Sequence, residues 1–333
     1  MRAATIQSLN CAGILGRRLR SHSAPRQSLN SIATAEVHTQ RSQAIVWCPE
    51  LETILPRQKR EYGRSSRTAT TSEPRGLLYQ DTMTPTEDVE DIVIVDLRDL
   101  QLPLRQQLLS KFYDGLITIN FPFPDELDPI EVWEGMLTPG HPLHSFTLMH
   151  ILLAFHKTDT LFENILGGNV SEYYPRSHCA LLSFIVVDEK MRRRGLGERL
   201  VKEGRAVVDR DGAQRGEVCS YYFAETNKPE TVDEEKDSMP PKIRVQVLMK
   251  LGFQRCDIEY VQPPLAPTQQ PFYDLHLCVH RREGEESTVT SKEMLAWMEE
   301  YWDSCDAARV GPVWEDTLNR LKSINTINIV PLV

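Results

Sequence analysis

Apolar and polar residues change their spacing along the chain, and the middle of the sequence has the pattern of strands. Short polar turns at 157–159 and 175–178 separate three apolar segments. Since parallel strands need much longer connections, we expect these segments to form an antiparallel meander. The strands predicted by β-branched and apolar richness are 91–97, 145–156, 159–174 and 179–188.

A helical period begins at Gly195. One face of the predicted helix carries Leu196, Leu200, Val201, Gly204, Val207 and Val208. The pattern then predicts a strand at 217–227, a helix at 241–252 and strands at 253–265 and 272–281. The crossing from 179–188 through the helix to 217–227 should be parallel and right-handed. A mixed sheet covered by helices follows.

The same pattern divides the chain into three parts. Residues 1–85 show no sustained periodicity and are expected to be a disordered or targeting segment, whereas 86–285 should form the folded domain. Residues 286–333 are expected to be a C-terminal helical extension. Its aromatic residues are interpreted as packing groups rather than a ligand cage: Trp297, Tyr301 and Trp302.

Charge is distributed unevenly. The chain of 333 residues has a net charge of −9, although its first 72 residues are net basic. The acidic body argues against nucleic-acid binding. The Arg- and Ser-rich start is typical of a transit peptide, which predicts a mitochondrial or plastid protein. A disordered tail, or a true start at Met83, would leave the protein cytoplasmic.

Several classes of site are not expected. The seven cysteines contain no C-x-x-C pair, which disfavours a zinc site or a disulfide framework. The histidines near the predicted meander show no metal-ligand spacing, so we assign no metal. No run of 18 or more apolar residues exists, and no membrane contact is predicted.

The segment DEKMRRRGLGERLV, residues 188–201, joins a predicted strand to a predicted helix. Backbone N–H groups at a helix start lack intrahelical partners, and together with the helix dipole they form an anion site. Gly195 and Gly197 have no Cβ, so a phosphate could approach the backbone closely. The motif therefore predicts a diphosphate-binding turn.

The motif does not match the common nucleotide loops. A P-loop requires Lys and then Ser or Thr after its second glycine, but Glu198 and Arg199 stand there. A dinucleotide fingerprint requires a third glycine at position 200, which is Leu200.

The residues resemble the GCN5-related N-acetyltransferases (GNAT family). The family signature, Arg or Gln, two residues, Gly, one residue, Gly or Ala, matches Arg192, Gly195 and Gly197 at the same strand-to-helix junction. The resemblance extends over about 91–281 and includes VLMKLGFQR, which looks like the end of the family's fourth helix. It implies a mixed, mostly antiparallel α/β sheet of about seven strands flanked by helices, with strands four and five splayed.

The resemblance also implies acetyl-CoA as co-substrate, lying in the gap between the splayed strands. Its pyrophosphate would bind the amides of the turn, and its pantetheine arm would bond to the backbone of the preceding strand. The cofactor-binding residues implied in this way are Ile185, Val186, Val187, Arg192, Arg193, Arg194, Gly195, Leu196, Gly197 and Asn227. Asn227 precedes Lys-Pro and could equally be a turn former.

Two residues are candidates for proton transfer. Glu225 lies near the predicted end of strand 217–227, where a partly desolvated carboxylate could act as general base, although a surface carboxylate is an equal alternative. Many family members carry a tyrosine acid on the fourth helix, but 241–252 has none. Tyr222 is the candidate acid, with Tyr221, Tyr173 and Tyr174 as alternatives, and for each of them packing is the competing explanation.

The predicted function is transfer of an acetyl group from acetyl-CoA to a primary amine, either a small molecule or a protein lysine, by direct attack in a ternary complex. The alternative is a catalytically silent acyl-CoA-binding or protein-interaction module of the same fold. The acidic segment 230–238 is a solvated loop or a contact for a cationic amine. The acceptor and the oligomeric state are left open by the sequence.

Overall fold

The computed structural model describes residues 91–121, 127–231, 239–265, 269–282 and 284–332. The expected targeting segment, 1–85, lies outside these residues. The acidic segment 230–238 lies almost wholly outside them as well. Among the described helices, none is both long and apolar enough to cross a membrane.

Within the described ranges, nine strands form one sheet in the order β1-β2-β3-β4-β5-β7-β6-β9-β8. All neighbouring strands are antiparallel except β4 and β5, which are parallel. The strands are β1 (Ile92–Asp96), β2 (Leu148–His156), β3 (Gly167–Tyr174), β4 (Cys179–Val187), β5 (Tyr221–Asn227), β6 (Phe253–Cys256), β7 (Leu275–His280), β8 (Thr288–Thr290) and β9 (Thr326–Val330).

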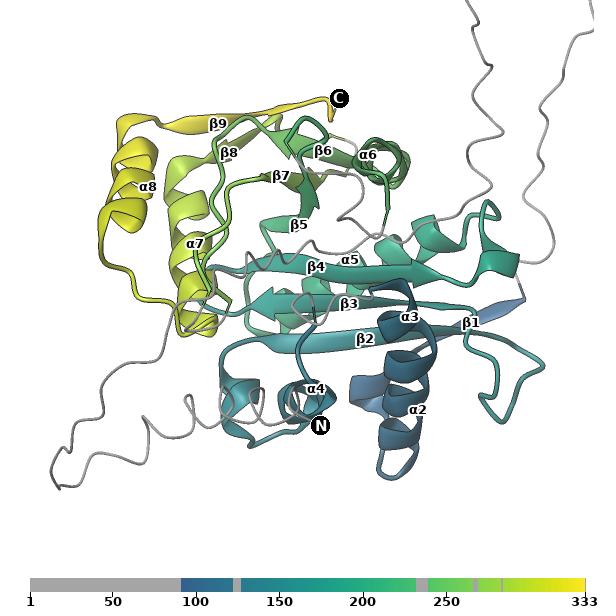
Figure 1. The fold of residues 1–333 in the computed structure, drawn as a ribbon. Helices are drawn as coiled ribbons and strands as arrows, with labels where there is room; N and C mark the ends of the chain where they lie inside the picture. The colour runs from purple at the N-terminus through teal and green to yellow at the C-terminus, as the bar shows by residue number, and fades with distance from the viewer. Residues whose placement is uncertain (1–90, 122–126, 232–238, 266–268, 283, 333) are drawn as a thin grey trace, which may run out of the picture.

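Helices cover both faces of the sheet, with α2 and α4 near one end and α8 at the other (Figure 1). The α-helices are α2 (Leu104–Phe112), α3 (Thr118–Asn120), α4 (Ile130–Leu137), α5 (Leu196–Gln214), α6 (Pro241–Lys250), α7 (Ser291–Ser304) and α8 (Pro312–Ser323). A π-helical turn, Tyr113–Ile117, joins α2 to α3. A short 3-10 turn, η7 (Glu189–Met191), follows β4.

The core consists of three apolar clusters. Because side chains along a strand alternate between the two faces of the sheet, one cluster lies on one face and two lie on the other. One cluster packs the α5 and α6 side chains against one face of the sheet. The other two lie on the opposite face, under α7 and α8 and under α2 and α4. Along β4, Leu182 and Ile185 belong to the first face, and Leu181 and Val186 to the second.

Strands β4 and β5 separate partway along their length, as the resemblance implied. Their register covers only Cys179–Leu182 against Tyr221–Ala224. Beyond this point β4 continues to Val187 against β3, and β5 continues to Asn227 against β7 (Figure 1). The register of β4 with β3 skips Ser183, between the pairs Ser171–Leu182 and Val170–Phe184, so a one-residue bulge in β4 accompanies the change. The mixed, mostly antiparallel fold with a splayed central pair is therefore confirmed.

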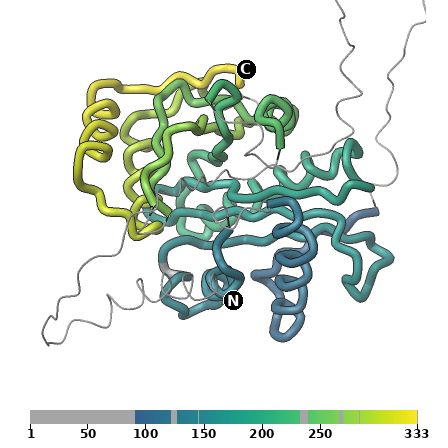
Figure 2. Tube along the Cα trace, in the orientation of Figure 1, coloured from purple at the N-terminus to yellow at the C-terminus, as the bar shows by residue number. Residues whose placement is uncertain are grey.

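The C-terminal segment differs from the helical extension that we expected. It contains β8 and β9 as well as α7 and α8, and β9 pairs with β6 through Arg255 and Val330. Figure 2 shows the yellow end of the chain running beside the green segment that carries β6. Strands β1 to β7 supply the seven strands implied for the domain, and the last segment adds two. A five-residue alternation, Thr326–Val330, was too short to identify without its partner strand.

Candidate functional site

The turn that follows β4 leads the chain into α5 within a few residues. Arg193 and Gly195 both have left-handed backbone conformations, with φ of 63° and 87°. Gly195 is the N-cap of α5, and the first helical bond of this end runs from Arg199 N to Gly195 O at 3.1 Å. Since Gly195 has no side chain, it cannot cap the first-turn N–H groups, which leaves them available to an anion.

The described side chains leave space over this turn. A Cβ placed on Gly195 would meet no described atom within 4 Å. On Gly197 it would meet Leu251 Cδ2 at 3.4 Å and Val187 Cγ2 at 3.8 Å, which are ordinary contacts. A Cβ at position 197 would therefore make only ordinary contacts with described atoms.

The arginines of the motif have different roles in the structure. Arg192 Nε donates to the carbonyl oxygen of Val187 at 3.0 Å, so this side chain fastens the turn to the end of β4. Arg193 and Arg194 are exposed, whereas Leu196 is buried among the α5 contacts and offers only its backbone. The predicted diphosphate contacts of Arg192 are thereby reduced to its backbone and the terminal guanidinium nitrogens.

The implied pantetheine-binding run lies where β4 has left β5. The side chains of Ile185 and Val186 are 3% and 1% exposed and pack on opposite faces, as we expected for residues that act through their backbone. Val187 is half-buried. Asn227 is buried as the last residue of β5 and pairs with Leu275, so it is a strand residue and not a turn former. Contacts of these residues with acetyl-CoA stay a prediction.

Glu225 is 1% exposed, which rules out the alternative of a surface carboxylate. Its Oε1 accepts a hydrogen bond from Tyr260, and its Oε2 accepts from Gln262 Nε2 at 2.8 Å and from the hydroxyl of Tyr301 at 3.4 Å. Burial raises the pKa of Glu225 to about 7, against these three hydrogen bonds, which favour the charged form. The carboxyl can therefore both accept and release a proton near neutral pH.

Tyr222 lies on the other face of the sheet from Glu225. Its ring is fully buried under α5, and its hydroxyl bonds to Ser171 Oγ at 2.6 Å and to Asn169 Nδ2 at 3.3 Å. Burial raises the pKa of Tyr222 to about 12. Because residues 222 and 225 have opposite parity on one strand, the two candidate catalytic side chains are not brought together.

The other tyrosines considered from the sequence have their own partners. Tyr221 donates to Glu293 Oε2 at 2.9 Å, and the Tyr173 hydroxyl lies 3.0 Å from His178 Nδ1. Tyr174 donates to Glu172 Oε2 at 3.3 Å and faces the same side as Glu225. Glu172 also accepts from Ser183 Oγ at 2.6 Å, and Ser183 is the first β4 residue beyond the register with β5.

Sequence reasoning missed Tyr260, Gln262 and Tyr301 as neighbours of Glu225. Tyr301 had been interpreted as a packing group, and its ring does stack on Trp297 at 5.3 Å between centroids. Tyr260 and Gln262 follow β6 and lie 35 and 37 residues from Glu225 along the chain. No local pattern could indicate these contacts, because they depend on how distant segments cross.

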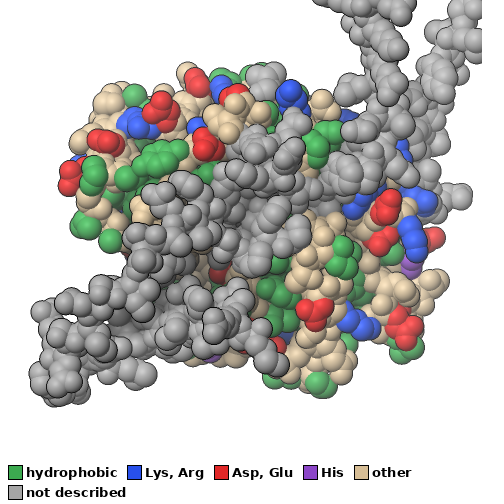
Figure 3. Space-filling view, viewed as in Figure 1, with side chains coloured by type: hydrophobic (Ala, Val, Ile, Leu, Met, Phe, Trp, Pro, Cys, Tyr) green, Lys and Arg blue, Asp and Glu red, His purple; other side chains and the backbone are tan. Residues whose placement is uncertain are grey.

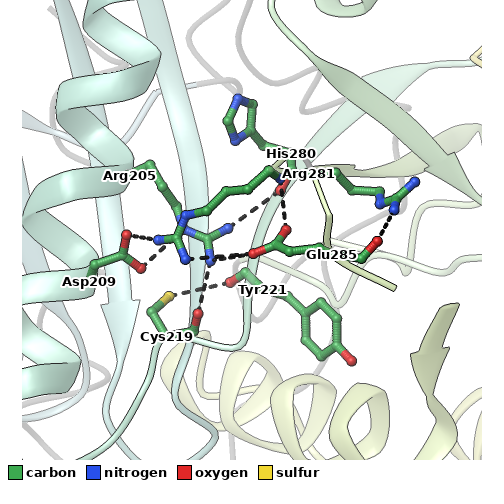
Figure 4. A network of polar contacts seen from close by, with 8 residues as sticks. Arg205, Asp209, Cys219, Tyr221, His280, Arg281 and Glu285 are labelled. Carbon is green, nitrogen blue, oxygen red and sulfur yellow. Dashed lines mark hydrogen bonds and ion pairs between the residues drawn. The ribbon is translucent and has the colours of Figure 1, made fainter. Parts of the chain in front are cut away.

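A buried arginine fixes α5 against the strands behind the turn (Figure 4). Arg205 donates to Asp209 Oδ1 at 3.1 Å, to the carbonyl of Cys219 at 2.9 Å and to that of His280 at 3.4 Å. The Cys219 thiol donates to the Tyr221 carbonyl, and burial raises its pKa to about 11. Cys219 is thus a protonated structural thiol at neutral pH.

On the face shown in Figure 3, positive and negative side chains are interspersed over the end that carries α8 and β9. The described residues of this view form no extended basic stripe of the kind that follows a phosphate backbone. Within the described ranges, no three His, Cys, Asp or Glu side chains are grouped so as to hold a metal ion.

No protein-family model matches the sequence, and no curated protein matches it. Several solved structures align with part of the chain. An acetyltransferase of the GNAT family from Bacteroides thetaiotaomicron, described as putative, has a TM-score of 0.42 at 15% identity over 63% of this chain and 96% of its own.

Two complexes with CoA are also similar. An acetyltransferase from Bacillus subtilis has a TM-score of 0.33 at 12% identity, over 57% of this chain and 99% of its own. An aminoglycoside 6'-N-acetyltransferase has a TM-score of 0.37 at 16% identity, over 58% of this chain and 99% of its own. The described chain combines a mostly antiparallel sheet, a parallel β4–β5 pair that separates partway along its length, and a glycine turn into α5.

Proposed function

We propose that this protein transfers an acetyl group from acetyl-CoA to a primary amine by direct attack within a ternary complex. The observation that carries the proposal is the position of Glu225, a carboxyl with a pKa of about 7 just beyond the point where β5 leaves β4. The anion-binding turn lies at the far end of the same part of β4. In this proposal the turn after β4 would hold the diphosphate, and Glu225 on β5 would accept the proton.

The residues of the turn fit the diphosphate of acetyl-CoA. The N-terminus of α5 presents N–H groups and the positive end of a 19-residue helix, and no described atom lies within 4 Å of a Cβ placed on Gly195. When bound, acetyl-CoA supplies an acyl group on a thiol leaving group. The turn would hold the diphosphate, while the edge of β4 at Ile185 and Val187 would orient the arm.

Glu225 would serve as the base. An ammonium acceptor must lose a proton before its nitrogen can form the new C–N bond and displace the thiolate. A carboxyl with a pKa of about 7 can take that proton near neutral pH, because about half of the carboxyl groups are ionised there and the carboxylate is more basic than an ordinary one. Since Glu225 is 1% exposed, the acceptor or a water molecule must enter the gap for the transfer to occur.

Two experiments test the proposal. Calorimetry measures binding of acetyl-CoA to the full-length protein, and an assay of thiol release with a library of primary amines measures turnover. Binding together with amine-dependent thiol release supports it. Absence of binding would overturn it. Small-molecule amines and lysine peptides in the same library decide between the two acceptor classes.

A catalytically silent module is the second candidate. It is favoured by α6, which has no tyrosine, and by the position of Tyr222 on the face away from Glu225. Acetyl-CoA binding without thiol release on any amine is the result that would select it.

A further inference from the structure

The three donors to Glu225 come from two segments that lie late in the chain. Tyr260 and Gln262 belong to the segment between β6 and β7, and Tyr301 belongs to α7. All three side chains are nearly inaccessible, at 2%, 1% and 3% exposure. The Glu225 carboxyl on β5 is therefore held by segments of the chain other than β4, the turn 192–197 and α5, which would bind the cofactor.

Aromatic packing fixes the positions of the two hydroxyls. Tyr301 stacks on Trp297 with 17° between the ring planes. Tyr260 stacks on the same indole at 6.3 Å and 23°. Trp297 also packs on Phe223, two residues before Glu225, at 4.4 Å. Side chains with rotamers fixed in this way can hold a carboxylate in one orientation at little further entropic cost.

The surroundings of Glu225 otherwise oppose its negative charge. Among the described residues no Lys, Arg or His forms an ion pair with it, so the hydrogen bonds alone favour its ionised form. Glu172 of β3 adds a like charge that raises the Glu225 pKa. The ionisable Tyr174 of β3 faces the same region, whereas Cys278 of β7 lies on the opposite face of the sheet. The protonation of Glu225 thus depends on the donors that face it.

We propose that Tyr260 and Tyr301 are positioning residues of the acetyl transfer, holding the Glu225 carboxylate as its base, so that α7 of the C-terminal segment is part of the active site. This inference rests on the proposed function. Neither tyrosine gives up its proton. The acceptor ammonium passes one proton to Glu225, and the amine nitrogen bonds to the acyl carbon as the C–S bond breaks. The second proton of the nitrogen passes to the departing thiolate, and Glu225 releases its proton to solvent.

The test compares Tyr260→Phe and Tyr301→Phe in the full-length chain. Each variant removes one hydroxyl and keeps the ring that packs on Trp297. Tyr273→Phe is the matched control, because Tyr273 lies in the segment with Tyr260 and is 50% exposed. Two readouts are taken: the pH profile of kcat/KM for the acceptor, and carbon NMR titration of the Glu225 carboxyl, assigned by its loss in Glu225→Gln.

We expect the acidic limb of the kcat/KM profile and the NMR midpoint to move together to higher pH in Tyr260→Phe, by about one to two pH units. Tyr301→Phe should move both by less, because its hydroxyl lies 3.4 Å from Oε2. Tyr273→Phe should leave both in place.

Each other outcome counts against the proposal. An unchanged NMR midpoint in Tyr260→Phe and Tyr301→Phe would show that neither hydroxyl holds the carboxylate. A moved midpoint with an unmoved kinetic limb would show that Glu225 is not the base. If Tyr260→Phe does not fold, Tyr301→Phe alone decides. Absence of thiol release from the unaltered protein would instead overturn the proposed function, and it is scored separately from the NMR titration.

Discussion

Tyr222 and Glu225 lie three residues apart on β5 and point to opposite faces of the sheet. Tyr222 belongs to the cluster under α5, and its hydroxyl bonds to Ser171 and Asn169. Glu225 bonds to Tyr260 and Tyr301 on the α7 face. Two side chains separated by the sheet cannot act on the same reacting atoms, so Tyr222 and Glu225 cannot be the acid and the base of one transfer.

Tyr222→Phe should therefore have little effect on turnover. We expect kcat within about threefold of the unaltered protein, together with a loss of about 1 kcal/mol in the free energy of unfolding from the missing hydrogen bonds. Steady-state thiol release and urea unfolding measure the two quantities. A fall in kcat of a hundredfold or more would restore Tyr222 as the candidate acid.

Glu225→Gln should lower kcat by about a hundredfold or more, because removal of a general base costs that order of rate. Binding of acetyl-CoA should change little, since Glu225 is separate from the turn that would hold the diphosphate. Single-turnover thiol release and calorimetry separate the two effects. The base lies elsewhere if turnover is unaltered at every pH.

The same variant should change how stability depends on pH. The folded-state pKa of Glu225, about 7, is above the ordinary value of 4.5. Its contribution to stability is therefore fully present below pH 4.5 and is lost as pH rises through 7. We expect Glu225→Gln to gain stability relative to the unaltered protein above pH 7, by up to about 3 kcal/mol. Urea unfolding at pH 5 and pH 8 measures the difference, and a constant difference would contradict the prediction.

Gly197→Val should weaken acetyl-CoA binding by about tenfold or more and raise its KM. A Cβ at this position meets described atoms only at 3.4 Å and beyond, and urea unfolding of the variant checks that the larger valine side chain does not destabilise the protein. The matched control is Gly115→Val, another glycine in a helical turn whose Cβ would meet no described atom within 4 Å. Equal loss of binding in both variants would contradict an anion seat at the turn.

His150, under the far end of α5, is a second group that couples stability to pH. Its Nδ1 lies 2.5 Å from Asp96 Oδ2, and its Nε2 lies 2.9 Å from Asp211 Oδ2. Burial alone would lower the pKa of His150, but the bonds to Asp211 and Asp96 outweigh it and raise the pKa above 6.5. The imidazolium thus has a carboxylate at each nitrogen, and Arg98 pairs with Asp211 at 2.8 Å.

Because the folded-state pKa is raised, the stability from His150 is fully present below pH 6.5 and is lost as pH rises through the folded value. His150→Gln should therefore destabilise the protein most near pH 6 and progressively less toward pH 9. Thermal unfolding of both proteins across this range measures the trend. A destabilisation that grows with pH would show that the neutral imidazole is the form the fold prefers.

Local patterns were sufficient to predict the features that depend on neighbouring residues. The turn of Arg192, Gly195 and Gly197 is a short-range arrangement of glycines at a strand-to-helix junction, and its left-handed Gly195 follows from the missing Cβ. The α5 face is likewise a repeat within one segment. Strand β9 was not predicted, because its five residues are too few to show a pattern and form a strand by pairing with the distant β6.

The sequence by itself determined the glycine turn and the order of β1 to β7 with α5 and α6, because periodicity and backbone freedom are properties of consecutive residues. The predicted strands 159–174 and 217–227 begin several residues before β3 and β5. Only the tertiary structure decided that Glu225 is buried, that Tyr222 faces away from it, and that Tyr260 and Tyr301 hold it. Those contacts join residues 35 and 76 positions apart. They depend on how α7 packs on the sheet, and packing between distant segments leaves no local pattern in the chain.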